Sequence, residues 1–209
     1  GAPLTLAHRE VNVTTQEVSE IWYLANPAVG SASLSATLNG ATEGGRGFRL
    51  TALNLSGAAQ AAPEAVAGTG ANGNSASTPI ATLTDNAALF GFTHNQANNA
   101  HTPGAGVTEL FDLDAVSIRA ALGTKTQSTA GATTFDWTWT GGTGTFNVQS
   151  VAAIAPVADP TFIETTVSVD IGEANQTAAV IVQSGFVGWD FPDNVSSDTL
   201  TLSDPFGTG

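Results

Sequence analysis

The sequence predicts an all-β protein, a jelly-roll β-sandwich of two antiparallel sheets, and three observations support this. Apolar and polar residues alternate with a period of two along most of the chain, which is the spacing of side chains on one face of a strand. Turn-forming pairs such as Asn26-Pro27 and Asn39-Gly40 separate the alternating stretches. Helical periodicity is almost absent. Many short strands with such turns are typical of sandwiches and jelly rolls.

Thirteen segments fit the strand pattern. In chain order they are residues 4–12, 19–26, 31–39, 47–55, 79–84, 87–95, 107–114, 117–126, 133–140, 145–154, 162–171, 177–187 and 198–204. Small residues dominate 58–77, which is expected to be a long loop with at most one helical turn. The stretch "PVADP" at 156–160 is the expected joint, so that residues 1–156 form the main part of the sandwich and residues 157–209 supply C-terminal strands.

Composition excludes several classes of partner. The chain has 209 residues with 5 Lys plus Arg against 18 Asp plus Glu, a formal net charge of −13. Nucleic acid and anionic membrane surfaces would be repelled, because binding to either needs clustered basic residues. No apolar run approaches the roughly 18 residues that a membrane span needs, so no membrane insertion is expected. Cysteine is absent and charged residues make up only 11%. This composition favours an extracellular or cell-surface location, with a virion surface as the alternative.

Four blocks of sequence carry a resemblance to a known family. They are "SEIWYLANPAVGSASLSATLNG", "LNLSGAAQAAP", "TPGAGVTELFD" and "TTFDWTWTGGTGTFNVQSVAAIAP". Together they resemble a jelly-roll/Ig-like β-sandwich repeat domain of large bacterial surface proteins and phage structural proteins. The opening strands of that domain are missing at the N-terminus and are matched at the C-terminus by "VSVDIGEANQTAAVIVQSGF". The resemblance therefore implies the domain in circularly rotated order.

The rotation is expected to interrupt one hairpin, because "LTLSDPFGTG" followed by "GAPLTL" has the pattern of strand, turn and strand. Three arrangements would produce this order. The chain is a circular permutant that closes on itself, one period of a tandem array, or a subunit whose C-terminal strands complete the sandwich of the next subunit. The last two would build open filaments, because head-to-tail contacts that do not close propagate.

Two segments are apolar on both strand faces, "EIWYLA" and "AAVIVQSGFV", which favours packing against a further layer or a neighbouring subunit. A local apolar patch under the 58–77 loop is the alternative. The residues expected at a subunit interface are Val180, Ile181, Val182, Phe186, Leu200, Leu202, Leu4 and Leu6.

No motif predicts catalysis. "GTGANG" at 68–73 matches G-x-G-x-x-G, but no strand-then-helix pattern surrounds it, so it is interpreted as a structural loop. The histidines His8, His94 and His101 lack the cysteine partners or ligand spacing of a zinc site. No G-x-S-x-G elbow marks a nucleophile. The chain is therefore not expected to be an enzyme.

Acidic and aromatic clusters offer two weaker sites. Asp112 and Asp114 share a strand face, and Asp190 and Asp193 lie in a second acidic stretch, so calcium is the one cofactor for which ligands exist. Solvated acidic surfaces are the alternative. In "FDWTWT", Trp137 and Trp139 lie on one face. They predict a core, with a sugar-stacking platform as the alternative.

The sequence thus predicts a structural subunit or repeat of an extracellular filament, sheath or surface fibre, assembled head-to-tail from copies of itself by strand complementation. A monomeric carbohydrate-binding or adhesive module and a virion decoration or fibre protein remain alternatives. N-x-S/T sequons begin at Asn12, Asn54, Asn175 and Asn194 and matter in a glycosylating host.

Overall fold

The structure is a computed structural model that describes residues 2–15, 17–29, 32–36, 49–96, 99–115, 118–141, 145–157, 170–171, 178–183 and 198–202. Within these residues the chain forms fifteen strands and no helix, so the predicted all-β class is confirmed. The strands are β1 (Thr5–Asn12), β2 (Glu17–Leu24), β3 (Ala32–Leu34), β4 (Leu50–Leu55), β5 (Ala65–Asn72), β6 (Ser75–Thr82), β7 (Ala87–Asn95), β8 (His101–Pro103), β9 (Thr108–Ala115), β10 (Ile118–Gln127), β11 (Gly131–Trp139), β12 (Phe146–Ile154), β13 (Asp170–Ile171), β14 (Ala178–Gln183) and β15 (Asp198–Leu202).

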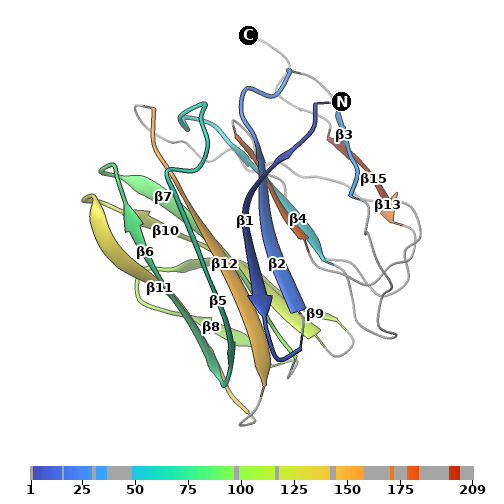
Figure 1. The fold of residues 1–209 in the computed structure, drawn as a ribbon, viewed down its shortest axis with the longest axis vertical. Helices are drawn as coiled ribbons and strands as arrows, with labels where there is room; N and C mark the ends of the chain where they lie inside the picture. Colours follow the sequence, from blue (N-terminus) through green and yellow to red (C-terminus); the bar gives the residue numbers. More distant parts are fainter. Residues whose placement is uncertain are drawn as a thin grey trace.

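The strands form a stack of sheets with a five-stranded sheet in the middle (Figure 1). Its order is β5-β12-β7-β10-β9, with all neighbours antiparallel. The sheet β6-β11-β8 packs on one face, and the sheet β1-β2-β14-β4 packs on the other. A further sheet has the order β13-β15-β3. The described part of the chain therefore has more sheets than the two expected, and the jelly-roll connectivity stays a prediction.

Strand β7 explains why the stack has a middle layer. All nine of its residues are buried. Leu89 packs with Phe135 of β11 on one side, whereas Phe90 packs with Ile21 of β2 on the other. Because "ALFGF" is apolar at successive positions, both faces of this strand need cover.

Aromatic side chains of β11 fill the space between the three-stranded and five-stranded sheets. Phe135, Trp137 and Trp139 are 0%, 0% and 3% exposed. Gly91 and Gly123 lie opposite each other on the facing sheet, and a Cβ on them would come within 2.3 Å of the Phe135 ring and 2.7 Å of the Trp137 ring, respectively. The core interpretation of the aromatic row is therefore confirmed. These indole rings present no face to a sugar.

Residues 58–77 are not the long loop that their small side chains predict, because they contain β5 and the start of β6. Strand β5 pairs with β12 and is approached closely by β1. A Cβ at Gly68 would lie 2.4 Å from His8 Nε2, and a Cβ at Gly70 would lie 2.7 Å from the Val11 carbonyl oxygen. The glycines of "GTGANG" thus allow two strands to pack closely, which agrees with a structural role.

The C-terminal strands pair within the single chain that the structure contains. Strand β14 lies between β2 and β4 and runs parallel to both. Strand β15 pairs with β3 and β13. The predicted place of these strands, beside residues 4–10 of the next copy, stays a prediction. Within this chain β1 pairs with β2, and β15 pairs with β3.

Candidate functional site

Strand β14 fills the space between β2 and β4, which we call the strand-acceptor slot. In sheet order β2 and β4 are separated by β14. Val180 of β14 lies opposite Trp22 of β2 on one side and Ala52 of β4 on the other. Strand β14 therefore supplies backbone partners to two strands at once. Without a strand in the slot, both walls would present unpaired edges.

The walls of the slot are apolar and buried. Ile21 on β2 is 2% exposed, and Leu50 and Ala52 on β4 are 1% and 0% exposed. Ile21 packs with Phe90 of the central sheet. A strand in the slot thus takes an interior position, which fits the apolar pattern predicted for "EIWYLA" and "AAVIVQSGFV".

The structure places the predicted interface residues at different positions. Val180, Ile181 and Val182 lie in β14, within the slot, whereas Leu200 and Leu202 lie in β15, opposite Leu34 and Ala32 of β3. Leu4 and Leu6 lie at the start of the β1 region, where Leu6 is 43% exposed. Phe186 is outside the described residues. Among the described members of the predicted set, those of β14 meet the slot and the others lie elsewhere.

Glu17 anchors the β2 wall to the central sheet. Its carboxylate accepts a hydrogen bond from the Gln96 side chain and lies 3.4 Å from His94 Nε2. The side chains of His94 and Glu17 are 3% and 8% exposed. Burial by itself would raise the pKa of Glu17, but the hydrogen bonds and charge of His94, with hydrogen bonds from Gln96 and Thr15, outweigh burial and lower that pKa. Glu17 therefore stays ionised between the two sheets.

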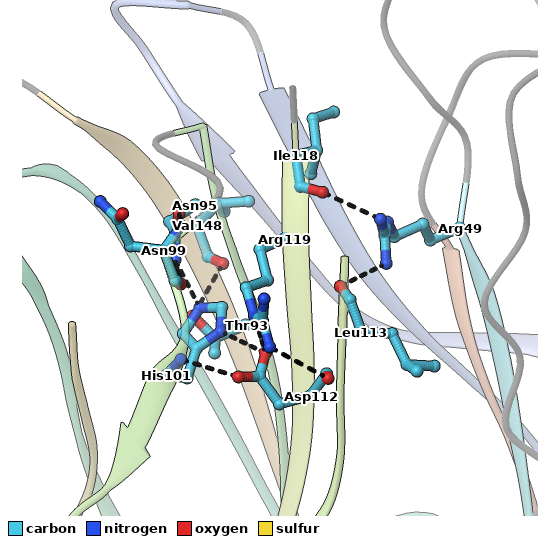
Figure 2. A network of polar contacts seen from close by, with 10 residues as sticks. All are labelled: Arg49, Thr93, Asn95, Asn99, His101, Asp112, Leu113, Ile118, Arg119 and Val148. Carbon is cyan, nitrogen blue, oxygen red and sulfur yellow. Dashed lines mark hydrogen bonds and ion pairs between the residues drawn. The ribbon is translucent and has the colours of Figure 1, made fainter. Parts of the chain in front are cut away.

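Arg49 anchors the β4 wall. It directly precedes β4, is 1% exposed, and donates to the carbonyl oxygens of Leu113 at 3.0 Å and Ile118 at 2.9 Å (Figure 2). These carbonyls belong to β9 and β10, so Arg49 ties β4 to the edge of the central sheet. Sequence reasoning missed Arg49. The available signal was a lone cation in an apolar segment, since a buried charge needs partners.

The acidic residues of β9 lie around the guanidinium of Arg119. Asp112 Oδ1 accepts a hydrogen bond from Arg119 Nε at 2.9 Å (Figure 2). Asp114 lies opposite Arg119 in the neighbouring strand. The pKa of Arg119 is raised, first by the hydrogen bond to Asp112 and further by the charges of Asp112, Asp114 and Glu109. The protein's own cation thus occupies the place where the sequence predicts calcium.

No cluster of three or more His, Asp or Glu side chains suited to a metal occurs in the part of the chain that the structure describes. A calcium ion at Asp112 would have to compete with Arg119. The second predicted pair, Asp190 and Asp193, lies outside the described residues.

His101 joins this network from β8, a short strand that the sequence analysis missed. Its Nδ1 is 2.9 Å from Asp112 Oδ1, and its Nε2 is 2.9 Å from Asn95 Nδ2 (Figure 2). Because an amide nitrogen only donates, Nε2 accepts and Nδ1 carries the proton given to Asp112. Burial lowers the pKa of His101 despite the hydrogen bond and charge of Asp112. Trp137 and Trp139 stand edge-on to the ring, at centroid distances of 5.8 and 5.3 Å.

The arrangement of His101 is that of a joint between sheets and not that of a general base. Both ring nitrogens have protein partners, and the side chain is 0% exposed. A base needs a nitrogen that can reach a substrate proton.

Comparison with protein-family models, curated proteins and solved structures found no match to this chain. Among the described residues, no helix is long and apolar enough to cross a membrane.

Proposed function

We propose that this chain is a structural subunit of an extracellular filament, sheath or surface fibre, in which β14 of one copy fills the strand-acceptor slot of the next. One observation supports the proposal above the others. Strand β14 is a central, parallel strand bonded on both sides, yet it comes from the far end of the chain. A strand of this kind is an insert that a neighbouring copy can supply.

The connection to β14 is long enough for either arrangement. Val157 ends the main part of the described sandwich, and twenty residues, 158–177, separate it from β14. Twenty residues span at most about 66–72 Å when fully extended. In the closed form, the one in the structure, β14 fills the slot of its own chain. In the exchanged form it fills the slot of the next copy.

The two forms share the same walls and the same backbone ladders, so the contacts that β14 makes in the slot do not distinguish them. The equilibrium between the closed and exchanged forms depends on the connection 158–177 and on subunit concentration, as in domain swapping. Because the donor strand and the slot are different surfaces, one-way exchange from each copy to the next is head-to-tail. It extends into an open polymer where the contacts do not close into a dimer or ring. Exchange between consecutive repeats of one polypeptide would give a tandem array by the same geometry.

The proposal assigns no catalytic role and no partner other than copies of this chain. It places the polymer outside the cell, where a net charge of −13 keeps unassembled subunits soluble. Strand complementation suits a load-bearing fibre, because a donor strand in the slot satisfies two edges and covers buried apolar walls.

Engineered cysteines test the proposal without competing disulfides from native cysteines, because the chain contains no cysteine. Ala52 and Val180 lie opposite each other in β4 and β14. Neighbouring strands lie about 4.8 Å apart, which is within the roughly 4.4–6.8 Å Cα separation of disulfides. The Ala52→Cys and Val180→Cys variants are mixed, unfolded, refolded at high concentration and oxidised. A disulfide between these two variants forms only across chains, so we expect crosslinked dimers on a non-reducing gel.

The matched control replaces Ala52→Cys with Leu83→Cys, since Leu83 is 72% exposed and lies outside the slot. This mixture should give few dimers. The double variant Ala52→Cys/Val180→Cys should form a ladder of crosslinked species, and negative-stain images should show fibres. If the single-variant mixture crosslinks no more than the control while the double variant gives only an internally crosslinked monomer, the chain is a self-contained sandwich and the proposal is wrong.

A further inference from the structure

Five buried polar atoms between the three-stranded and five-stranded sheets have no hydrogen-bond partner in the described part of the protein. They are Trp137 Nε1, Trp139 Nε1, Asn147 Nδ2, Asn147 Oδ1 and Gln149 Oε1. The four residues that carry them are at most 3% exposed. Because more than about 90% of buried polar groups in folded proteins are paired, a cluster of this size indicates a partner outside the protein.

The four residues lie on the facing surfaces of the two sheets. Trp137 and Trp139 are two residues apart on β11 and share its inner face, as Asn147 and Gln149 do on β12. The two faces meet directly, since Gln149 Nε2 donates to the Phe135 carbonyl oxygen of β11 at 2.8 Å. That bond also sets the orientation of the Gln149 amide and leaves Oε1 as the free end.

Trp137 is turned so that its N–H edge faces the central sheet. A Cβ built on Gly123 of that sheet would lie 2.7 Å from Trp137 Cζ2. Atom Cζ2 belongs to the same edge of the indole as Nε1. The N–H edge of the Trp137 indole therefore faces β10 of the central sheet.

The side-chain amide of Asn95 does not pair with the unpaired atoms of Asn147. Asn95 lies opposite Asn147 in the sheet. Its Nδ2 donates to the Asn99 carbonyl at 3.0 Å and contacts His101 Nε2 at 2.9 Å, and its Oδ1 accepts from the Asn99 backbone N–H at 3.4 Å. Both hydrogens of its NH₂ group are thus in use, and its oxygen already accepts one bond.

The atoms without a hydrogen-bond partner include both donors and acceptors. They belong to two indole N–H groups, one amide NH₂ group and two amide oxygens. Their neutrality and the mixture of donors and acceptors match a ligand that both donates and accepts. We propose that ordered water occupies this polar end of the space between the sheets and joins the Trp137 and Trp139 indoles to Asn147 and Gln149.

The test uses the sign of a stability change. Leu has nearly the shape of Asn but no polar group. If water bridges Asn147 to the indoles, Asn147→Leu breaks a satisfied network and lowers the urea midpoint. If the site is dry, the same change removes an unpaired buried amide and raises the midpoint. Asn12→Leu is the matched control, because the Asn12 amide donates to two protein carbonyls and its loss lowers the midpoint in either case.

A second measurement on the unchanged protein does not depend on any variant folding. Nuclear Overhauser contacts between water and the indole Hε1 protons of Trp137 and Trp139 should be present, with the sign of long-lived water. Their presence together with a lowered midpoint for Asn147→Leu supports the proposal. A raised midpoint overturns it, and so does the absence of these contacts.

Discussion

Replacing Asp112 with Asn should destabilise the fold strongly, because it removes a charge that three donors surround. The Asp112 side chain is 7% exposed. Oδ1 accepts from Arg119 Nε at 2.9 Å and from His101 Nδ1 at 2.9 Å, while Oδ2 accepts from the His101 backbone N–H at 2.8 Å. An Asn amide has one oxygen, so its NH₂ group has to face at least one of these donors.

The expected loss in the free energy of unfolding follows from the burial of the Asp112–Arg119 ion pair. Removing one partner of a buried ion pair costs about 3–5 kcal/mol. Arg119 is 21% exposed and can turn to water, so the lower end, about 3 kcal/mol, applies. For a chain of this size, about 2–4 °C of melting temperature corresponds to each kcal/mol, which gives a fall of about 6–12 °C.

Urea unfolding at neutral pH, followed by tryptophan fluorescence, measures the loss. The matched control is Asp114→Asn on the same strand, where the carboxylate is exposed and the expected change is within about 0.5 kcal/mol. A loss below about 1 kcal/mol for Asp112→Asn would refute the argument that this carboxylate joins the sheets. An equal loss for both variants would show a general effect of charge.

Replacing Gly91 with Ala places a Cβ 2.3 Å from the buried Phe135 ring and should lower the free energy of unfolding by about 1–3 kcal/mol. Adding Phe135→Leu should make the combined loss smaller than the sum of the single losses, and strict additivity in urea unfolding contradicts the clash. Acidification should also destabilise the protein. Burial lowers the pKa of His101 below its ordinary value of 6.5. The contribution of the neutral His101 ring to the free energy of unfolding is therefore present above about pH 6.5 and is lost as the pH falls through the lowered pKa. The urea midpoint should fall as the pH is lowered below about 6.5, and in the His101→Gln variant the midpoint should depend less on pH. Folded protein from a glycosylating host should carry no glycan at Asn12, whose amide nitrogen is buried against two backbone carbonyls. Mass spectrometry of the tryptic or proteolytic peptide checks this, and a modified Asn12 in folded protein would contradict the contacts.

Strands with strong local alternation could be predicted from the sequence. Residues 87–95 match β7, and 145–154 match β12 within one residue. Strand β5 was missed because its small residues give no contrast between faces. Its glycines are required by the close approach of β1, which is a contact between segments far apart in the chain.

The site could be predicted only where its partners are local. Arg119 lies seven residues after Asp112, on the next strand of a hairpin, so the ion pair could have been found by aligning the two predicted strands. The anchors of the slot could not. Arg49 and Leu113 are 64 positions apart, and Glu17 and Gln96 are 79 positions apart.

The sequence by itself determined that this protein is built from strands and that β11 turns its aromatic residues to one face, because the pleat of a strand is a local property of the backbone. It also indicated that β14 belongs in an interior position. Only the tertiary structure decided that β14 lies between β2 and β4, that a middle sheet is covered on both faces, and that Arg119 lies where calcium was expected. These outcomes depend on which distant segments meet, and pairing partners are chosen by the packing of whole sheets and not by any single stretch of residues.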